Sequence, residues 1–138
     1  MNAYSYDEIE TGQKESFSVT VTEEAVNAFR GFTGDINPLH NDAEYAKEKG
    51  YDGRVAYGML TASYLSTLAG VYLPGEKSLI QGVDIKFSRP VYIGDRLEIE
   101  GEVSEKNDTF NVIKLKVSVK NQDGKKVLKG SMQIGVLE

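Results

Sequence analysis

Residues 58–72 read GMLTASYLSTLAGVY, and this stretch decides the fold. It belongs to a run of 21 residues, 55–75, that carries no charged side chain. A helix that is apolar all round is either buried in a protein or placed in a membrane. Spanning a bilayer takes about 20 mostly apolar residues, whereas glycines and hydroxyl side chains interrupt this run and Pro74 follows it. We therefore predict a buried central helix over about 58–72.

Strand-like segments follow that helix to the end of the chain. They cover residues 79–87, 97–104, 110–120 and 127–137. Turn-forming residues separate them, namely Pro90 with Gly94-Asp95, then Asn107-Asp108, then Asp123-Gly124. Successive strands joined by short turns predict an antiparallel meander of these four strands.

The first 50 residues contribute one more strand and two helices. Phe17, Val19 and Val21 alternate with polar residues, as in a half-buried strand. Thr22 is a suitable N-cap for a helix that runs to about residue 32, because acidic residues follow it in the first turn. A second short helix over 43–49 ends at Gly50, which suits a left-handed C-terminal cap.

Five strands and one large apolar helix can bury their apolar surfaces against each other. The sheet must cover its apolar face, and the helix over 58–72 is the only large apolar partner for it. This α+β arrangement, a curved antiparallel sheet of about five strands wrapped around a helix, is the hotdog fold, and we expect one domain over 1–138. A wrapped sheet keeps exposed edges, so we also expect a homodimer or a dimer of dimers that pairs edge to edge.

The composition argues against several classes of function. The formal charge of −5 and the lack of a Lys/Arg block disfavour a nucleic-acid surface. Cysteine is absent, which rules out disulfides and thiolate chemistry and fits a reducing compartment. The N-terminal residues carry acids and no apolar core of a secretory signal. We therefore expect a cytoplasmic protein with no membrane span.

His40, the only histidine, lies in the segment 34–41, which reads GDINPLHN. Pro38 disfavours helical backbone at the residue before it, and Gly34 marks a helix end, so we predict that the segment is a loop. Such a loop can turn Asp35 and His40 toward one target, and a carboxylate with an imidazole suffices for acid–base chemistry near neutral pH. The alternative is structural, because Asp and Asn in turns often bond to their own backbone.

A metal site has little support in the sequence. One histidine, without a cysteine or a second histidine, leaves only carboxylates to complete the ligand set. Such a set suits zinc poorly. We expect neither a metal nor a redox cofactor.

Three segments carry a family resemblance. Gly34-Asp35-x-Asn37-Pro38-x-His40 resembles the hydratase 2 motif of the MaoC-like, (R)-specific enoyl-CoA hydratases. Gly58-Met59-Leu60 followed by Ser66 resembles the start of that family's central helix, and residues 87–91 with Gly94-Asp95 resemble its first long strand and turn. Together the similar segments cover most of the chain from about residue 15 to its end.

The resemblance implies an activity and a set of roles. It implies syn addition of water to a trans-2-enoyl-CoA to give the (R)-3-hydroxyacyl-CoA, and the reverse dehydration, with CoA or a carrier arm as part of the substrate. Asp35 and His40 would hold the reacting water between them. The resemblance does not decide which of the two acts as the base and which acts as the acid. The backbone N–H of Gly58 would receive the thioester carbonyl, and a helix N-terminus has the positive dipole end for it.

Three further residues belong to the expected site. Ser66 matches a family serine that steadies the aspartate, or its hydroxyl is satisfied within its own helix. Asn37 and Tyr57 are expected among the residues that bind substrate. Family members usually carry His where this chain has Tyr57. This difference leaves open how the loop is supported at this position and how the pantetheine arm of the substrate fits.

Two other functions remain open on the same fold, because a fold does not determine an activity. An acyl-CoA thioesterase is the first alternative, although residues 55–75 lack the carboxylate that such enzymes commonly carry near the central helix. A non-catalytic acyl-CoA-binding protein is the second, and it would need only the pocket.

Overall fold

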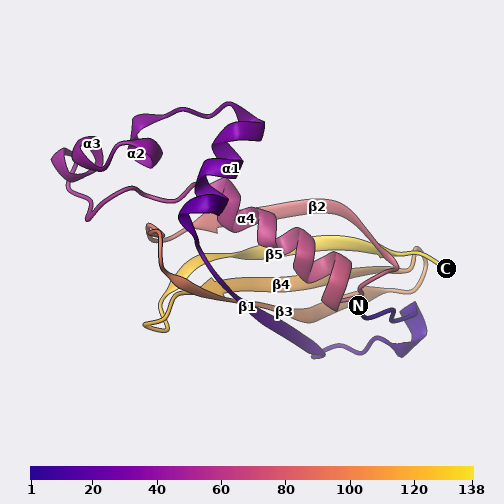
Figure 1. The fold of residues 1–138 in the computed structure, drawn as a ribbon. Helices are drawn as coiled ribbons and strands as arrows, with labels where there is room; N and C mark the ends of the chain where they lie inside the picture. Colours follow the sequence, from indigo (N-terminus) through magenta and orange to yellow (C-terminus); the bar gives the residue numbers. More distant parts are fainter.

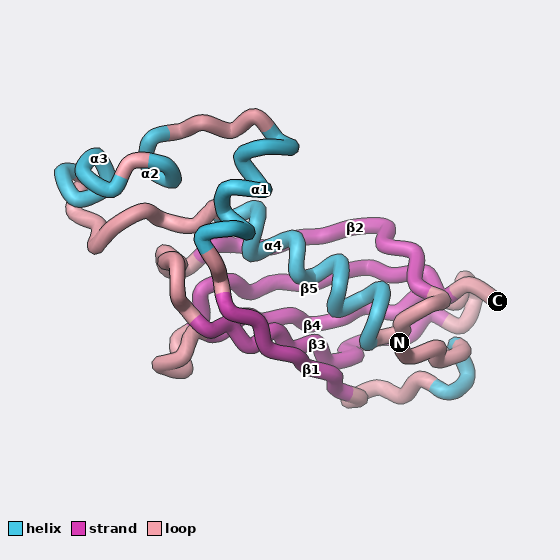
Figure 2. The backbone as a smooth tube through the Cα atoms, viewed as in Figure 1, coloured by secondary structure: helices cyan, strands magenta, loops and turns pink.

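The central helix lies along the concave face of a curved sheet in the computed structural model, which describes residues 1–138 (Figure 1). Helix α4 spans Gly58–Thr67 and continues as a π-helical turn, η2, over Leu68–Tyr72. Figure 2 shows this helix lying on one side of the sheet. The predicted helix over 58–72 and the predicted hotdog fold are confirmed.

Five antiparallel strands form the sheet. They are β1 (Lys14–Thr20), β2 (Ser78–Phe87), β3 (Arg96–Asn107), β4 (Val112–Lys120) and β5 (Lys126–Val136), and their spatial order is β1-β3-β4-β5-β2. Strands β1 and β2 are therefore the two edges of the sheet.

The predicted four-strand meander is wrong for its first pair. Strands β3, β4 and β5 do form a meander, but β2 pairs with β5 and not with β3. The segment 88–95 is tied to the residues before α4 instead of forming a hairpin, because Ala56 N donates to Val91 O at 2.7 Å and Val55 bridges Tyr92. This connection carries the chain across the end of the sheet, so β3 starts beside β1.

Three helices precede α4, after a short 3-10 turn, η1, at Tyr6–Glu8. Helix α1 spans Glu23–Thr33, and its N-cap Thr22 accepts a hydrogen bond from Ala25 N at 3.1 Å, as predicted. Helices α2 (Pro38–Asn41) and α3 (Ala43–Glu48) are short. In Figure 1 they lie beyond the end of the sheet, as an extension of the molecule near the start of α4.

The core lies between α4 and the concave face of the sheet. Leu65 and Leu68 of the helix are fully buried with inward side chains such as Ile99, Leu115 and Ile134. The helix is not covered all round, however, because Met59 is 62% exposed and Ser63 and Ser66 are exposed on the same side. No helix of the chain has both the length and the apolar character that crossing a bilayer requires.

Candidate active site

A pocket of about 320 Å³ lies at the N-terminal end of α4, and we call it the α4 pocket. Six of its twelve lining residues are apolar, and His40, Gly58 and Thr61 are among the others. The remaining wall comes from the chain just before α4, the end of β2, the segment that follows it and the start of β5. A mostly apolar hollow with a few convergent polar groups is the usual form of a small-molecule site.

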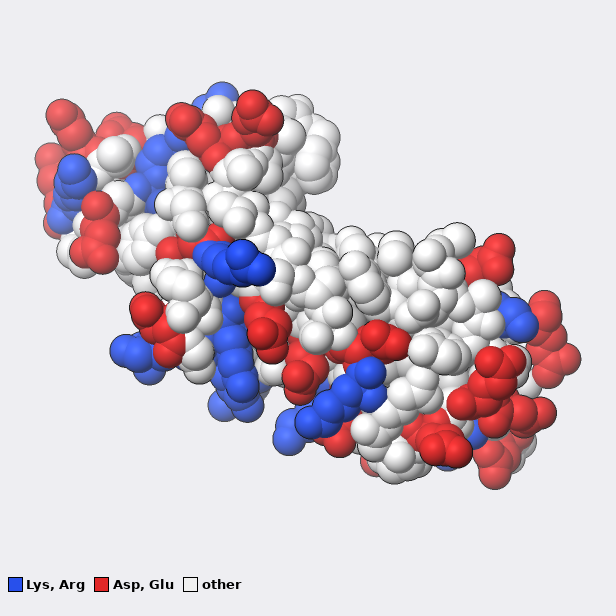
Figure 3. Space-filling view, turned by 60° about the horizontal axis from the view of Figure 1, so that its bottom comes forward, with Lys and Arg blue, Asp and Glu red and all other residues white.

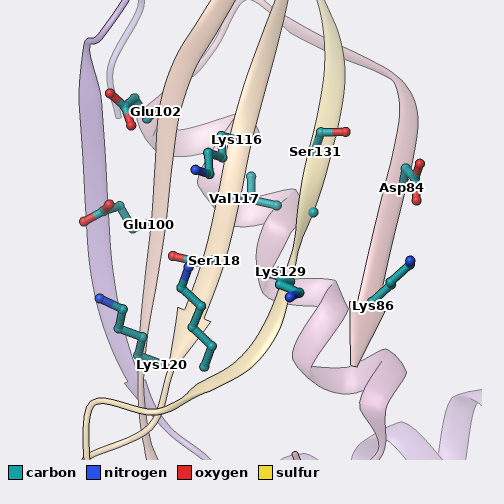
Figure 4. A pocket seen from close by; sticks show the side chains of 12 residues that line it. Asp84, Lys86, Glu100, Glu102, Lys116, Val117, Ser118, Lys120, Lys129 and Ser131 are labelled. Atoms are coloured by element: carbon teal, nitrogen blue, oxygen red, sulfur yellow. The ribbon is translucent and has the colours of Figure 1, made fainter. Parts of the chain in front are cut away.

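A second hollow of about 440 Å³ lies on the outer face of the sheet, opposite α4 (Figure 4). It is lined by charged and hydroxyl side chains of β2 to β5, and Val117 is its one apolar residue. Acidic and basic side chains are interspersed on the side of the molecule that Figure 3 shows. This groove contains no histidine and no helix terminus, so the α4 pocket is the better candidate for chemistry.

The segment that leads to His40 is a turn followed by a helix. Gly34 ends α1 with φ +75°, and the Asp35 carboxylate then accepts from Asn37 N at 3.1 Å. The loop prediction is wrong from Pro38 onward, because Asn37 caps α2 by accepting from Leu39 N at 2.9 Å and proline suits the first helical position. Asp35 thus precedes a helix that carries His40.

The His40 ring is oriented by the chain just before α4. Nδ1 lies 2.7 Å from the carbonyl oxygen of Val55. Because a carbonyl can only accept, Nδ1 carries the proton, and the neutral ring has its lone pair on Nε2. Arg54 also holds this helix, since its Nε donates to His40 O at 2.8 Å. His40 therefore enters the pocket as a fixed ring with a free proton acceptor.

Tyr57 lies beneath the two expected catalytic residues. It is 2% exposed, and its ring centroid lies 4.2 Å from that of His40. Its hydroxyl donates to the backbone carbonyl of Asp35 and accepts from Asn41 Nδ2 at 3.0 Å. Asn41 Nδ2 also donates to Asn37 O at 2.8 Å. Tyr57 does not line the α4 pocket, so its contacts support the site from below.

The Gly58 backbone N–H is unpaired within the chain. It lies at the first position of a ten-residue helix, where amide groups lack intrahelical partners and the dipole favours negative charge. A Cβ atom at this position would come within 3.1 Å of the Phe87 ring, which lines the same pocket. A side chain at position 58 would therefore press on the Phe87 wall of the pocket.

Comparison with known proteins identifies the chain. Residues 5–125 match the MaoC like domain family. The chain belongs to this family. It is 33% identical over 120 residues to an (R)-specific enoyl-CoA hydratase of Aeromonas caviae. The aligned segment covers 87% of this chain and 90% of that protein. It is 34% identical over 105 residues to an (R)-specific enoyl-CoA hydratase of Rhodospirillum rubrum, which covers 73% of each.

Solved structures of MaoC-like relatives share the fold. The R-hydratase PhaJ1 of Pseudomonas aeruginosa superposes with a TM-score of 0.91 at 36% identity, over 97% of this chain and 86% of that one. The (R)-hydratase of Aeromonas caviae superposes with a TM-score of 0.89 at 31% identity, over 93% and 97%. The family resemblance carried by residues 34–40 is confirmed.

Within this MaoC-like chain the expected site residues are only partly brought together. His40 and Gly58 share the α4 pocket, whereas Asp35, Asn37 and Ser66 are exposed and outside its lining. The Ser66 hydroxyl makes no hydrogen bond within the chain, and no group of three or more potential ligand side chains could hold a metal ion. Tyr57 links the parts, since it contacts both Asp35 and His40.

Thr61 is a pocket residue that the sequence reasoning missed. It lines the α4 pocket with Gly58 and is buried, yet its hydroxyl has no partner. The sequence pattern that indicates this role is the spacing of three residues between Gly58 and Thr61, because helical residues three apart share a helix face.

Proposed function

We propose that this MaoC-like domain is an (R)-specific enoyl-CoA hydratase, a hydro-lyase that adds water syn to trans-2-enoyl-CoA and also dehydrates the (R)-3-hydroxyacyl-CoA. The observation that carries the proposal is that His40 and the free Gly58 N–H line one largely apolar pocket. Relatives about one third identical to this chain bear the name (R)-specific enoyl-CoA hydratase. The site thus combines a proton acceptor with a donor for a carbonyl oxygen.

The Gly58 amide would act on the thioester carbonyl. When the oxygen of water adds to C3, the C2–C3 double-bond electrons move onto the carbonyl oxygen and form an enolate. A fixed N–H at a helix N-terminus stabilises that negative charge more than the neutral carbonyl. The amide therefore lowers the barrier to addition.

His40 and Asp35 would carry out the proton transfers. The free Nε2 of His40 supports a role as acceptor from the attacking water, because Nδ1 is committed to Val55 O. Asp35 keeps one carboxylate oxygen free of hydrogen bonds, and Tyr57 contacts both the Asp35 backbone and the His40 ring. The pair would return a proton to C2 from the same face. Addition of water is redox-neutral, so the proposed reaction needs no cofactor besides the CoA of the substrate.

A second copy of the chain is the proposed partner. Strand β2 is an edge of the sheet, and its Leu79, Val83 and Phe87 are half exposed. Pairing of two such edges would cover these apolar side chains. Ser66 is exposed on α4, and its proposed role remains to steady the Asp35 carboxylate. The cytoplasmic location stays a prediction.

The test is a hydration assay. The purified protein should remove the enoyl-thioester absorbance of crotonyl-CoA and yield the (R)-alcohol. Asp35→Asn and His40→Ala should each lower kcat at least about 100-fold without changing thermal unfolding. Asp42→Asn is the matched control, because Asp42 caps α3 and asparagine can keep that cap.

Two results would contradict the proposal. Wild-type protein that leaves crotonyl-CoA unchanged is not this hydratase. Release of free CoA thiol from acyl-CoA would assign a thioesterase instead.

A further inference from the structure

Thr61 has the one buried side-chain polar atom in the chain without a hydrogen-bond partner. The residue is 2% exposed. A buried hydroxyl without a partner destabilises the folded state, and native proteins rarely keep one without a reason. The hydroxyl is therefore a feature to be explained.

The helix does not satisfy this hydroxyl. Threonine in a helix commonly donates to the carbonyl four residues earlier, which here belongs to Tyr57. That carbonyl instead receives the backbone N–H groups of Leu60 at 3.0 Å and Thr61 at 3.2 Å. Ser63, two residues on, does bond back to Leu60 O at 2.6 Å. The Thr61 hydroxyl is thus left available to a group outside the helix.

The position of Thr61 relates it to Gly58. Both residues line the α4 pocket. Helical residues three apart are neighbours, with Cβ positions about 5–6 Å apart, and helical side chains lean toward the N-terminus. The Thr61 side chain therefore covers the pocket wall next to the Gly58 amide.

We propose that Thr61 is a second hydrogen-bond donor to the thioester carbonyl, beside the Gly58 N–H; this inference rests on the proposed hydratase function. A carbonyl oxygen has two lone pairs, so two donors can bind it at once. When the C3–O bond forms and the double-bond electrons reach the carbonyl oxygen, both donors stabilise the enolate. Thr61 keeps its proton throughout, and the charge is removed when C2 takes up a proton.

The test compares two substitutions of Thr61 in the full-length protein with crotonyl-CoA as substrate. Thr61→Val removes the hydroxyl and keeps the shape, and it should lower kcat about 100-fold with a much smaller change in KM, as for loss of one oxyanion donor. Thr61→Ser keeps the hydroxyl and should retain most of the activity. Thr67→Val is the control, since Thr67 is on the same helix but does not line the pocket.

A second measurement does not depend on turnover. Ligand-free Thr61→Val should unfold at the same or a higher temperature than wild type, because it removes a buried hydroxyl that has no partner. Wild-type kcat in Thr61→Val, or equal loss of kcat in Thr61→Val and Thr61→Ser, would overturn the inference. So would a lower unfolding temperature of Thr61→Val. Absence of hydration by wild type would instead refute the proposed function.

Discussion

At the scale of single residues, Tyr57 differs from the residue that is usual in the family, and its contacts support the site. The phenol hydroxyl binds the Asp35 backbone, and the ring packs on His40 and, at 4.6 Å between centroids, on Phe29. Asn41 extends the network, since its side chain bonds Tyr57 and Asn37 and accepts from Arg30 at 3.1 Å. Tyr57 is thus better described as a positioning residue than as part of the substrate-binding wall.

Removing the Tyr57 hydroxyl should loosen the pair that it positions. We expect Tyr57→Phe to lower kcat about 10-fold, on the order of the loss of one hydrogen bond, with KM nearly unchanged. Because His40 is the only histidine, its imidazole NMR signals can be followed without ambiguity and should broaden or shift in the variant.

Tyr92→Phe is the matched control for that substitution. Its hydroxyl accepts from Asp52 N at 3.3 Å in an exposed turn, so its loss should leave kcat and the His40 signals unchanged. If Tyr57→Phe keeps wild-type kcat and wild-type His40 signals, the hydroxyl does not position the pair.

At the scale of elements, the central helix approaches the sheet most closely at η2. A Cβ atom on Gly101 of β3 would lie 2.9 Å from Leu68 Cδ2 and 3.5 Å from Leu115 Cδ1. Leu68 and Leu115 are fully buried, so neither can move aside freely. Glycine at this strand position is what lets the end of the helix lie on the sheet.

Gly101→Ala should therefore overpack the core. We expect the free energy of unfolding to fall by about 1–3 kcal/mol, as for other added core methyl groups, measured by urea denaturation. Gly31→Ala on α1 is the control, because nothing lies within 4 Å of its added Cβ. That control should gain stability, by about 0.5–1 kcal/mol, since glycine disfavours a helix interior. Unchanged stability in Gly101→Ala would show that the helix can shift on the sheet.

At the scale of the whole molecule, contacts of the N-terminal segment tie it to distant parts of the chain. The Tyr6 hydroxyl donates to Asp108 Oδ1 at 2.6 Å, and Tyr4 donates to Glu15 at 3.0 Å. Burial, followed by the hydrogen bond to Asp108, raises the pKa of Tyr6 to about 12. The hydrogen bond to Glu15 raises the pKa of Tyr4, and burial raises the pKa of Tyr64.

These shifts predict loss of stability at alkaline pH. An unfolded tyrosine ionises near pH 10, below the folded pKa of Tyr6, so the unfolded state binds fewer protons above that pH. The stability that Tyr6 contributes is complete below about pH 10 and is lost as the pH rises toward about 12. Unfolding temperatures measured across this range should fall less steeply in Tyr6→Phe.

Tyr45→Phe provides the comparison for the alkaline experiment, because the Tyr45 hydroxyl makes no hydrogen bond within the chain. It should follow the wild-type curve. Equal slopes in wild type and Tyr6→Phe would mean that Tyr6 does not govern the alkaline loss.

The proposed dimer predicts a specific sensitivity of the β2 edge. Val83→Lys places a charge on a half-exposed apolar position of that edge, and it should convert a dimer to a monomer by light scattering because a buried charge opposes association. Phe110→Lys, on the exposed β3–β4 turn, should leave the mass unchanged. A wild-type monomer would refute edge pairing.

The sequence by itself determined most of the helices and strands, and it named the candidate catalytic residues. The uncharged run 55–75 predicted the central helix, and alternation with turn residues predicted the strands, because both signals are local. The spacing in residues 34–40 and its family resemblance named Asp35 and His40, and Gly58 followed from the helix start.

Only the tertiary structure decided which strands pair and which side chains contact one another. It placed β2 beside β5, because residues 88–95 bond to the chain before α4 instead of closing a hairpin. It put Tyr57 under His40, left Asp35 outside the pocket lining and left the Thr61 hydroxyl without a partner. Each of these features depends on contacts between groups that are far apart in sequence, or on a hydrogen bond that the helix does not make. Local sequence patterns predict neither of them.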